Sequence, residues 1–371
     1  MKLSFRNNHI LKILNSFAQT SLPLDLFLSS YFRNCSSIGS KDRKFIAEKI
    51  YHIIRWKSLI DFHLEKPISD EKRIELLETL DLKKASQNKD IPLHIRAGFS
   101  KNYFEMVENT LLKNALNFCH ISNEKAPTTI RANTLKISRD DLFDRFSKNY
   151  RVEKTLSENG IVFLEKINFF SLLEFKEGFF EIQDEGSQMI ADLVIPDEKS
   201  TILDYCAGAG GKTLAFAPKM KNKGQIYLHD VRKKALEQAK KRLKRAGIQN
   251  FQIADAKKLK KLKSKIDILF LDVPCSGSGT LRRNPDMKWK FTKEDLLELI
   301  EKQRAIFKNA FDLVKQGGTI IYATCSIFKE ENKDQTKYFL KNYSLKLEKE
   351  LSFLPEKEGK DGFFAAVLKK N

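Results

Sequence analysis

The feature that most constrains the fold is the stretch Ile266–Gly279, which reads IDILFLDVPCSGSG. Ile268–Leu271 is a continuous apolar run, typical of a strand that is buried on both faces of a parallel sheet. The run ends at Asp272, and Pro274 cannot donate a hydrogen bond to a neighbouring strand. An acid and then a thiol, Cys275, are therefore predicted just beyond the carboxyl end of a central strand, where open α/β sheets bind their ligands.

A second strand-like run, Thr319–Ala323, ends in the same way at Thr324-Cys325-Ser326. If the two predicted strands are neighbours, two thiols and a carboxylate meet at one edge of the sheet. The spacing of the motifs leaves that adjacency open. A lone cysteine at a strand end can also be a small buried hydrophobic residue, and this interpretation is favoured for Cys35 and Cys119 and remains open for Cys206.

Strands alternate with helices from Asp184 onwards, which favours an α/β domain with a largely parallel sheet. The predicted strands cover 201–205, 225–229, 251–254, 266–271, 319–323, 345–351 and 363–368, and the predicted helices 187–194, 212–220, 231–246, 292–314 and 330–342. No helix separates the last two strands, so they are expected to form an antiparallel pair. The basic run 257–265 is interpreted as a solvated linker.

The length of 371 residues allows two or three domains. Residues 1–121 are predicted to be mostly helical, with candidates at 9–17, 24–32, 41–64 and 102–118. Residues 122–183 are predicted to form a small α+β unit, with strands at 128–132, 161–165 and 179–182 and a helix at 139–146. The α/β domain then covers 184–371.

The formal net charge is +19, which favours a polyanionic partner. Nucleic acid is the first candidate and an anionic membrane surface the second, although the bias could also reflect genome composition. The 5 scattered cysteines favour a reducing compartment over a disulfide framework. The start lacks a secretory apolar core, and no apolar run approaches the roughly 18 residues of a membrane helix. We expect a cytoplasmic protein that does not enter a membrane.

The segment DYCAGAGGKT at 204–213 joins a predicted strand to a helix through three glycines. Glycines at such a junction let the backbone approach a ligand at the positive end of the helix. A Walker loop would need glycine where Cys206 stands, and a dinucleotide fingerprint would need it at Thr213. The loop is therefore glycine-rich without being built for a triphosphate.

Asp230 follows the second strand of the domain, where an acid usually accepts hydrogen bonds from ribose hydroxyls. Asp255 follows the third strand and could accept from an adenine amine. Together with the glycine-rich loop, these positions describe a bound adenosine without a triphosphate, which fits S-adenosylmethionine. Either aspartate, taken alone, could equally be a helix N-cap.

The two thiols suggest methylation at carbon 5 of cytosine, a poor nucleophile. A thiolate that adds to carbon 6 makes an enamine, which attacks the methyl sulfonium, and a base then removes the proton from carbon 5 so that the thiol leaves. Asp272 could hold the edge of the pyrimidine and support protonation of its ring nitrogen. Lys212 or the sulfonium would lower the pKa of a nearby thiol.

The ordered motifs resemble those of the Nop/Sun (RsmB-type) family of RNA cytosine-5 methyltransferases, over residues of about 127–371. They are QDEGSQ at 183–188, DYCAGAGGK at 204–212, DVPCSGSG at 272–279, RRNPD at 282–286, YATCS at 322–326 and DGFFAA at 361–366. The fold that this resemblance implies is a Rossmann-like class I methyltransferase sheet of seven strands with the last pair antiparallel. Residues 42–56 resemble part of the NusB-like helical domain that precedes the catalytic region in some members.

The resemblance also implies roles for individual residues. It makes Cys325 the nucleophile, with Cys275 assisting product release and Lys212 and Asp272 close to the reacting groups. The implied S-adenosylmethionine site consists of Cys206, Ala207, Gly208, Ala209, Gly210, Gly211, Lys212, Asp230, Asp255 and Asp272. The family loop usually reads CAAPGGK, so Ala209 replaces a proline here and should make the loop more flexible. No metal is implied.

Three functions are consistent with these motifs. The first is a monomeric RNA cytosine-5 methyltransferase, with ribosomal RNA preferred as the substrate and transfer RNA possible. The second is a DNA cytosine-5 methyltransferase that uses Cys275, because a Pro-Cys pair serves that purpose in those enzymes. The third is a non-catalytic RNA-binding or ribosome-assembly factor that has kept the fold.

Overall fold

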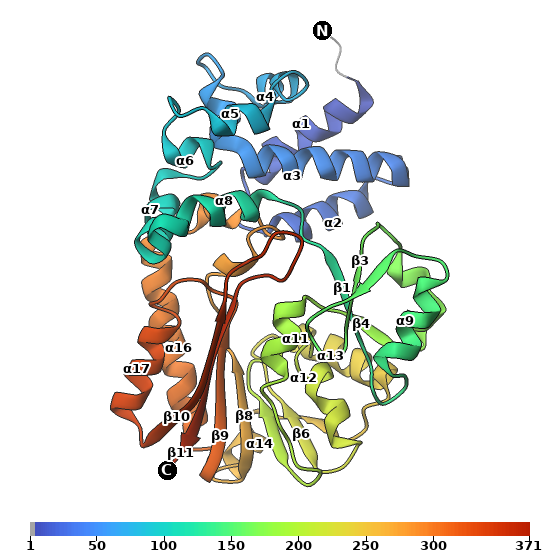
Figure 1. The fold of residues 1–371 in the computed structure, drawn as a ribbon, viewed down its shortest axis with the longest axis vertical. Coiled ribbons are helices and arrows are strands. Elements are labelled where there is room, and N and C mark those ends of the chain that lie inside the picture. The colour runs from blue at the N-terminus through green and yellow to red at the C-terminus, as the bar shows by residue number, and fades with distance from the viewer. Residues whose placement is uncertain (1–3) are drawn as a thin grey trace. The chain divides into compact units, whose positions relative to one another are not determined.

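The computed structural model describes residues 4–371 (Figure 1). The described chain divides into two compact units. The helical unit contains the residues up to Lys125 together with Thr280–Asp295, and the α/β unit contains Ala126–Gly279 together with Leu296–Asn371. Among residues 4–371, no helix combines the length and the apolar character needed to cross a membrane.

The helical unit consists of short helices around a core rich in isoleucine and leucine. Its helices are α1 (Phe5–Phe17), α2 (Leu24–Asn34), α3 (Ser40–Phe62), α4 (Asp70–Leu76), α5 (Leu82–Gln87), α6 (Leu93–Arg96), α7 (Lys101–Leu111), α8 (Ala115–Asn123) and α15 (Met287–Lys290). The isoleucines of α3 at 46, 50, 53 and 54 are all buried, so the helical periodicity correctly predicted the inner face of that helix. The segment around α15 was not predicted to belong to this unit.

One predicted helix of this unit is wrong as a single element. The range 102–118 is divided into α7, the 3₁₀ turn η1 (Leu112–Asn114) and α8. The break falls at Leu112, whose φ of 50° lies outside the helical region. No glycine or proline marks the position, so the sequence carried no local signal for the break.

A small four-stranded antiparallel sheet opens the α/β unit, in the order β2-β3-β1-β4. Its elements are β1 (Thr128–Ala132), α9 (Arg139–Ser147), β2 (Val152–Lys154), β3 (Gly160–Phe163), η2 (Phe169–Ser171), α10 (Leu173–Lys176) and β4 (Phe180–Ile182). Arg131 joins this sheet to the rest of the unit, because its buried guanidinium donates to Gln183 Oε1 and to Leu214 O, both at 2.7 Å.

The main sheet has seven strands in the order β10-β11-β9-β8-β5-β6-β7. They are β5 (Thr201–Asp204), β6 (Gln225–Leu228), β7 (Phe251–Ile253), β8 (Ile266–Asp272), β9 (Val314–Thr324), β10 (Leu345–Phe353) and β11 (Phe363–Lys370). Neighbours from β7 through β9 are parallel, whereas β11 is antiparallel to both β9 and β10. The predicted fold, an α/β sheet with an antiparallel last pair, is confirmed.

Helices cover both faces of this sheet, because side chains of successive strand residues point to opposite faces. They are α11 (Glu185–Ala191), α12 (Thr213–Phe216), η3 (Ala217–Met220), α13 (Lys233–Ala246), α14 (Ala256–Lys261), α16 (Lys293–Phe311) and α17 (Lys333–Asn342). In β8, Ile268 and Phe270 pack in the cluster with α12 and α13, whereas Leu269 and Leu271 pack in the cluster with α16 and α17. The continuous apolar run of β8 therefore reflects burial on both faces.

Three predicted boundaries are corrected. The helix expected over 212–220 changes to a 3₁₀ turn at Ala217, where Pro218 cannot donate an intrahelical bond. The helix expected to end at Val314 ends at Phe311, because Val314 already pairs with Ile266 in the sheet. The expected linker at 257–265 begins instead as the helix α14, capped by Asp255.

Candidate active site

The two predicted strand-end thiols lie together. Strands β8 and β9 are parallel neighbours with Asp272 opposite Ala323, so the loops that follow them leave the sheet side by side. Cys275 Sγ lies 3.3 Å from Cys325 Sγ, and the backbone N–H of Cys325 donates to Cys275 Sγ over 3.3 Å. Gly279 N donates to Cys325 O over 2.9 Å and ties the two loops again. The adjacency that the sequence left open is thus present.

A partly buried ion pair joins the glycine-rich loop to the end of β8. Lys212 Nζ donates to Asp272 Oδ2, and both side chains are largely withdrawn from solvent. Burial disfavours the charge of Lys212, but the Asp272 carboxylate outweighs it, so the pKa of Lys212 is raised. The pair therefore keeps a fixed positive and a fixed negative group beside each other at the carboxyl ends of β5 and β8.

Cys275 is the thiol that keeps its proton. Its hydrogen bond with Cys325, together with burial, raises the pKa of Cys275 well above the usual value. Cys275 can therefore serve as the hydrogen-bond donor to Cys325 Sγ, 3.3 Å away. Such a pair can present one sulfur as a nucleophile and hold a proton on the other.

Two glycines of the loop after β5 have left-handed backbone angles. Gly208 and Gly210 have φ values of 53° and 76°, which side chains disfavour. A Cβ at Gly210 would meet Ala239 Cβ at 3.1 Å, whereas one at Gly211 would meet nothing within 4 Å. Gly210 therefore allows close packing against Ala239 of α13, and Gly211 leaves open space beside the backbone. Cys206, Ala207 and Ala209 complete this loop, and Arg242 holds it by donating to Ala209 O over 2.9 Å.

Asp230 lies at the carboxyl end of β6 and is oriented by the loop. Its Oδ2 accepts from Gly208 N and its Oδ1 from Arg232 N, both at 2.8 Å. Burial would raise the pKa of Asp230, but hydrogen bonds from Arg232 and Gly208 lower it. Val231, the next residue, is 86 % exposed and offers an apolar surface beside the carboxylate.

Asp255 and the remaining cysteines have more ordinary surroundings. Asp255 is exposed at the end of β7, and its Oδ1 caps α14 by accepting from Lys258 N over 2.7 Å. The N-cap alternative is therefore present for this residue. Burial raises the pKa of Cys119 to about 12, as expected for a buried hydrophobic thiol, and burial also raises the pKa of Cys206. Cys35 lies in the helical unit, away from any strand end.

Several residues that the sequence did not single out line the site or support it. Asp204 is fully buried at the end of β5 and accepts from Thr213 Oγ1 over 2.6 Å. Glu331 is also fully buried and accepts from Ser276 N over 2.9 Å and from Ser276 Oγ over 2.5 Å. Asp204 heads the quoted loop motif and could have been noticed, whereas Glu331 had no signal beyond its place in the first turn of the helix predicted over 330–342, which begins only at Lys333 in the structure.

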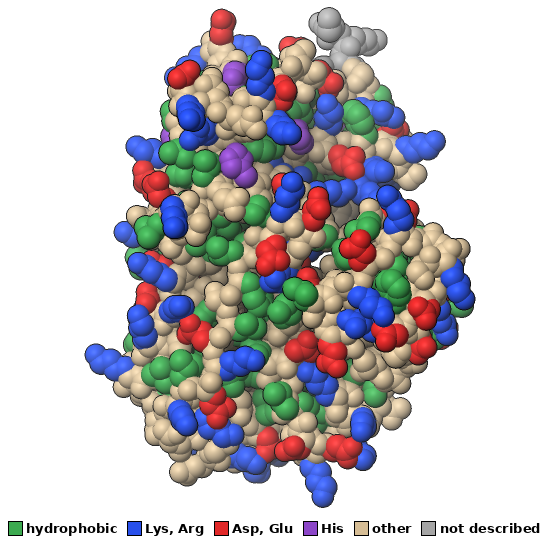
Figure 2. Space-filling view, in the orientation of Figure 1, with side chains coloured by type: hydrophobic (Ala, Val, Ile, Leu, Met, Phe, Trp, Pro, Cys, Tyr) green, Lys and Arg blue, Asp and Glu red, His purple; other side chains and the backbone are tan. Residues whose placement is uncertain are grey.

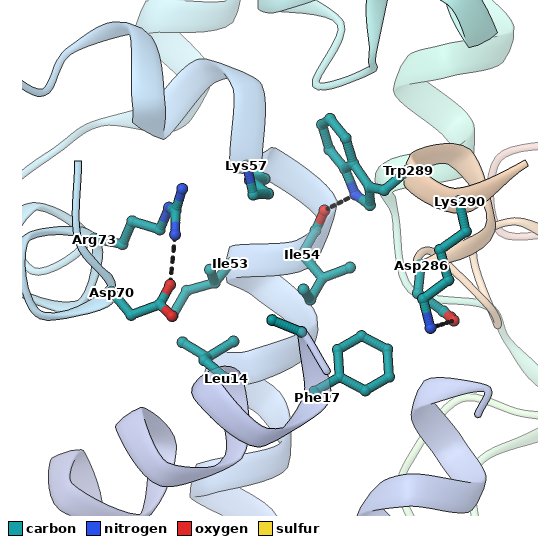
Figure 3. Close-up of a pocket in the computed structure, with 11 residues that line it drawn as sticks. Leu14, Phe17, Ile53, Ile54, Lys57, Asp70, Arg73, Asp286, Trp289 and Lys290 are labelled. Carbon is teal, nitrogen blue, oxygen red and sulfur yellow. Dashed lines mark hydrogen bonds and ion pairs between the residues drawn. The ribbon is translucent and has the colours of Figure 1, made fainter. Parts of the chain in front are cut away.

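A separate pocket lies within the helical unit (Figure 3). Its volume is about 200 Å³, and Phe17, Ile54 and Trp289 form part of its apolar wall. Two of its polar groups bond within the unit: Trp289 Nε1 donates to Ile54 O over 2.8 Å, and Arg73 donates to Asp70. The carboxylate oxygens of Asp286 are buried without a hydrogen-bond partner among residues 4–371, and Lys290 Nζ lies 3.7 Å from Oδ2. No cysteine lines it, so the thiol chemistry belongs to the α/β unit.

Residues 191–369 match the family model described as 16S rRNA methyltransferase RsmB/F. The chain is 32% identical over 280 residues to the probable ribosomal RNA small subunit methyltransferase B of Bacillus subtilis, covering 69% of this chain and 62% of that protein. The chain thus spans somewhat less than two thirds of the length of this relative.

Two solved structures share the fold. The crystal structure of PH0851 superimposes with a TM-score of 0.84 over 100% of both chains, at 24% sequence identity. A methyltransferase homologue from Pyrococcus horikoshii gives a TM-score of 0.68 at 25% identity, covering 75% of this chain and 98% of that one. The α/β unit therefore has a Rossmann-like methyltransferase fold, and its residues 191–369 match the RsmB/F methyltransferase family.

Proposed function

We propose that this protein transfers a methyl group from S-adenosylmethionine to carbon 5 of a cytosine in RNA through a transient bond between Cys325 and the base. The observation that carries the proposal is the pair of thiols, 3.3 Å apart, at the carboxyl ends of two parallel strands beside the Lys212–Asp272 ion pair. The match to a family of RNA methyltransferases supports the reaction class.

S-adenosylmethionine is the methyl donor of this family, and the residues around the glycine-rich loop fit it. Gly211 leaves open space where the backbone can approach a ligand. Asp230 is held by Gly208 N in an orientation suited to ribose hydroxyls, and Val231 offers an apolar surface to adenine. The second oxygen of Asp255 would accept from the adenine amine. When bound, the cofactor supplies an electrophilic methyl group.

In the proposed reaction, Cys325 adds as a thiolate to carbon 6 of cytosine, and the electron pair released into the ring makes carbon 5 nucleophilic. After carbon 5 has taken the methyl group, its proton must leave to a base. The Cys325–carbon 6 bond then breaks, and Cys325 regains a thiolate or thiol. Cys275 lies close enough to pass a proton to the departing sulfur.

Asp272 and Lys212 are proposed to act on the edge of the base that carries the exocyclic amine and the ring nitrogen, across the ring from carbon 6. A carboxylate can hydrogen bond the exocyclic amine and the protonated ring nitrogen that stabilises the adduct. Because Lys212 holds Asp272 in place, the carboxylate needs little reorganisation when the base enters. The lysine charge also favours a thiolate nearby.

We propose small-subunit ribosomal RNA as the substrate, because the relatives that span most of this chain carry that description. The net charge of +19 suits a polyanionic substrate. Lys and Arg side chains are spread over the face seen in Figure 2, among acidic ones. The helical unit is proposed to contribute to RNA binding, and the target cytosine would need to be unpaired or flipped out.

A covalent trap tests the proposal directly. RNA that contains 5-fluorocytidine at the target keeps a fluorine where the proton must leave, so the adduct cannot resolve. We expect a protein–RNA adduct with the natural chain and none with Cys325→Ala, as judged by denaturing gel electrophoresis. Cys275→Ala should still form the adduct, and with unmodified RNA it should accumulate adduct because release is slowed.

Other outcomes would favour the alternatives. Loss of the adduct in Cys275→Ala but not in Cys325→Ala would favour the chemistry of DNA cytosine-5 methyltransferases. RNA binding without transfer of labelled methyl groups to total RNA would favour an assembly factor. Bisulfite sequencing of RNA from cells that lack the gene should reveal the cytosine that loses its protection.

A further inference from the structure

A carboxylate that the proposed chemistry does not use lies buried behind the two thiols. Glu331 has no exposed surface. Its Oε1 accepts from Ser276 N over 2.9 Å, and its Oε2 accepts from Ser276 Oγ over 2.5 Å. Both donors belong to the residue directly after Cys275, so the carboxylate fixes the backbone on the carboxyl side of that thiol.

Gln303 extends this support to the other side of Cys275. Its Nε2 donates to Glu331 Oε1 over 2.9 Å and to Pro274 O over 3.0 Å. The Tyr322 hydroxyl in β9 lies 3.0 Å from Gln303 Oε1 and 2.8 Å from the backbone carbonyl of Glu331, and it can donate its one proton to either. The residues before and after Cys275 are thus held by one amide and one carboxylate.

The same cluster reaches the loop that carries Cys325. Ser276 Oγ lies 3.1 Å from Ser326 Oγ, and Ser326 directly follows Cys325. Ser278 Oγ lies 3.0 Å from Ser326 Oγ and accepts from Ile327 N over 2.9 Å. All three serines are buried, so the two thiol-bearing loops share one water-excluded hydrogen-bond network anchored on Glu331.

We propose that Glu331 is a positioning residue that sets the separation and alignment of the Cys275 and Cys325 sulfurs. This role rests on the proposed function. One thiol bonds the base and the other passes a proton to the departing sulfur, so both sulfurs must stay within reach of the same ring. A carboxylate provides acceptors on both oxygens. In Glu331→Gln, an amide NH₂ group replaces one carboxylate oxygen and faces the donors of Ser276 or Gln303. Two donors cannot bond each other, so one of the loops would have to shift.

A displacement of about 1 Å in a catalytic group can lower a rate by as much as about 100-fold. For Glu331→Gln we therefore expect kcat for methyl transfer to fall about 10- to 100-fold, with KM for RNA changed by less than about twofold, because no group that binds RNA is removed. Circular dichroism and the melting temperature report whether the variant keeps the fold.

A second readout does not depend on methyl transfer. Diamide oxidises the thiol pair by taking up the two electrons and two protons released as the Sγ–Sγ bond forms, and peptide mass mapping measures the Cys275–Cys325 disulfide. We expect Glu331→Gln to form this disulfide at least about fivefold more slowly than the natural chain. Ser276→Ala removes one of the two donors and should slow it in the same direction, by less. The exposed Glu348→Gln is the matched control and should change neither rate.

The outcomes separate the two proposals. A folded Glu331→Gln variant with unchanged kcat and unchanged disulfide rate overturns the positioning role, even if its melting temperature is lower. If Glu331→Gln does not fold, Ser276→Ala decides, and an unchanged disulfide rate in it overturns the role. A natural chain that transfers no methyl group, combined with slower disulfide formation in both variants, would contradict the proposed function and still support positioning by Glu331.

Discussion

At the scale of single residues, Asp204 makes the free energy of unfolding depend on pH. Burial raises the pKa of Asp204 from 3.8 to about 7, against the hydrogen bond from Thr213. Below about pH 4 the carboxyl is protonated in both the folded and the unfolded chain. As pH rises towards 7, the unfolded chain loses the proton while the folded chain keeps it, and this difference favours the unfolded chain. The free energy of unfolding therefore falls as pH rises from about 4 up to the folded pKa of about 7.

Asp204→Asn should therefore gain stability relative to the natural chain as pH rises. The asparagine oxygen can still accept from Thr213, and no ionisation remains to oppose folding. We expect the difference in free energy of unfolding to shift by roughly 2 to 3 kcal/mol in favour of the variant between pH 5 and pH 7.5. Urea denaturation at several pH values measures it. A difference that is constant across this range, as expected for the exposed control Asp144→Asn, would contradict the argument.

The residues that could be predicted from the sequence are those whose roles follow from local pattern. Asp272 ends a strand that is buried on both faces and Cys275 follows it, whereas Cys325 directly follows the neighbouring parallel strand. Glu331 could not be predicted, because its role depends on a contact with Ser276, far away in the chain. Asp255 shows the opposite limit: the same acid at a strand end suits a ligand or a helix cap, and local pattern does not separate them.

At the scale of elements, the break between α7 and α8 predicts a stabilising substitution. Leu112 has φ 50° and ψ −123°, a region that residues with a Cβ adopt only under strain, and its side chain is 72 % exposed. Leu112→Gly should relieve strain of about 1 to 3 kcal/mol while costing about 0.5 to 1 kcal/mol in unfolded-chain entropy. We expect a net gain of about 1 kcal/mol, seen as a higher midpoint of urea denaturation. Leu112→Ala keeps the Cβ, and equal stability of the two variants would argue against strain at this position.

Helices and strands were predicted well where a long apolar pattern in the sequence determines them. They were predicted poorly where hydrogen bonds from residues far away in the chain determine them. Strands β8, β9 and β11 contain long apolar runs and were predicted from them. The kink of α3 at Trp56, by contrast, is accompanied by distant donors: Trp289 Nε1 bonds Ile54 O over 2.8 Å, and Lys288 Nζ bonds Arg55 O over 2.7 Å. Such partners also explain why Thr280–Asp295 belongs to the helical unit, which no boundary signal in the sequence indicated.

At the scale of the whole molecule, the net charge of +19 predicts steep salt dependence of RNA binding. Each phosphate contact with a single strand contributes about −0.7 to the slope of log affinity against log salt. With about five contacts, affinity should fall roughly 100-fold between 50 and 200 mM KCl. Fluorescence polarisation with a labelled single-stranded RNA measures the slope, and a flat dependence would show that the excess positive charge does not contact phosphate.

The same titration can locate the basic surface. Lys240 and Lys244 on α13 are exposed and line a groove along the edge strand β7, whereas Lys257 and Lys260 lie exposed at α14 outside that lining. A groove lets a strand contact lysines and the apolar edge together, so we expect Lys240→Gln with Lys244→Gln to make the slope shallower by about 1.4. Lys257→Gln with Lys260→Gln removes the same charge and should leave the slope nearly unchanged. Equal effects of the two pairs would mean that charge acts through the field of the whole protein and not through contacts in this groove.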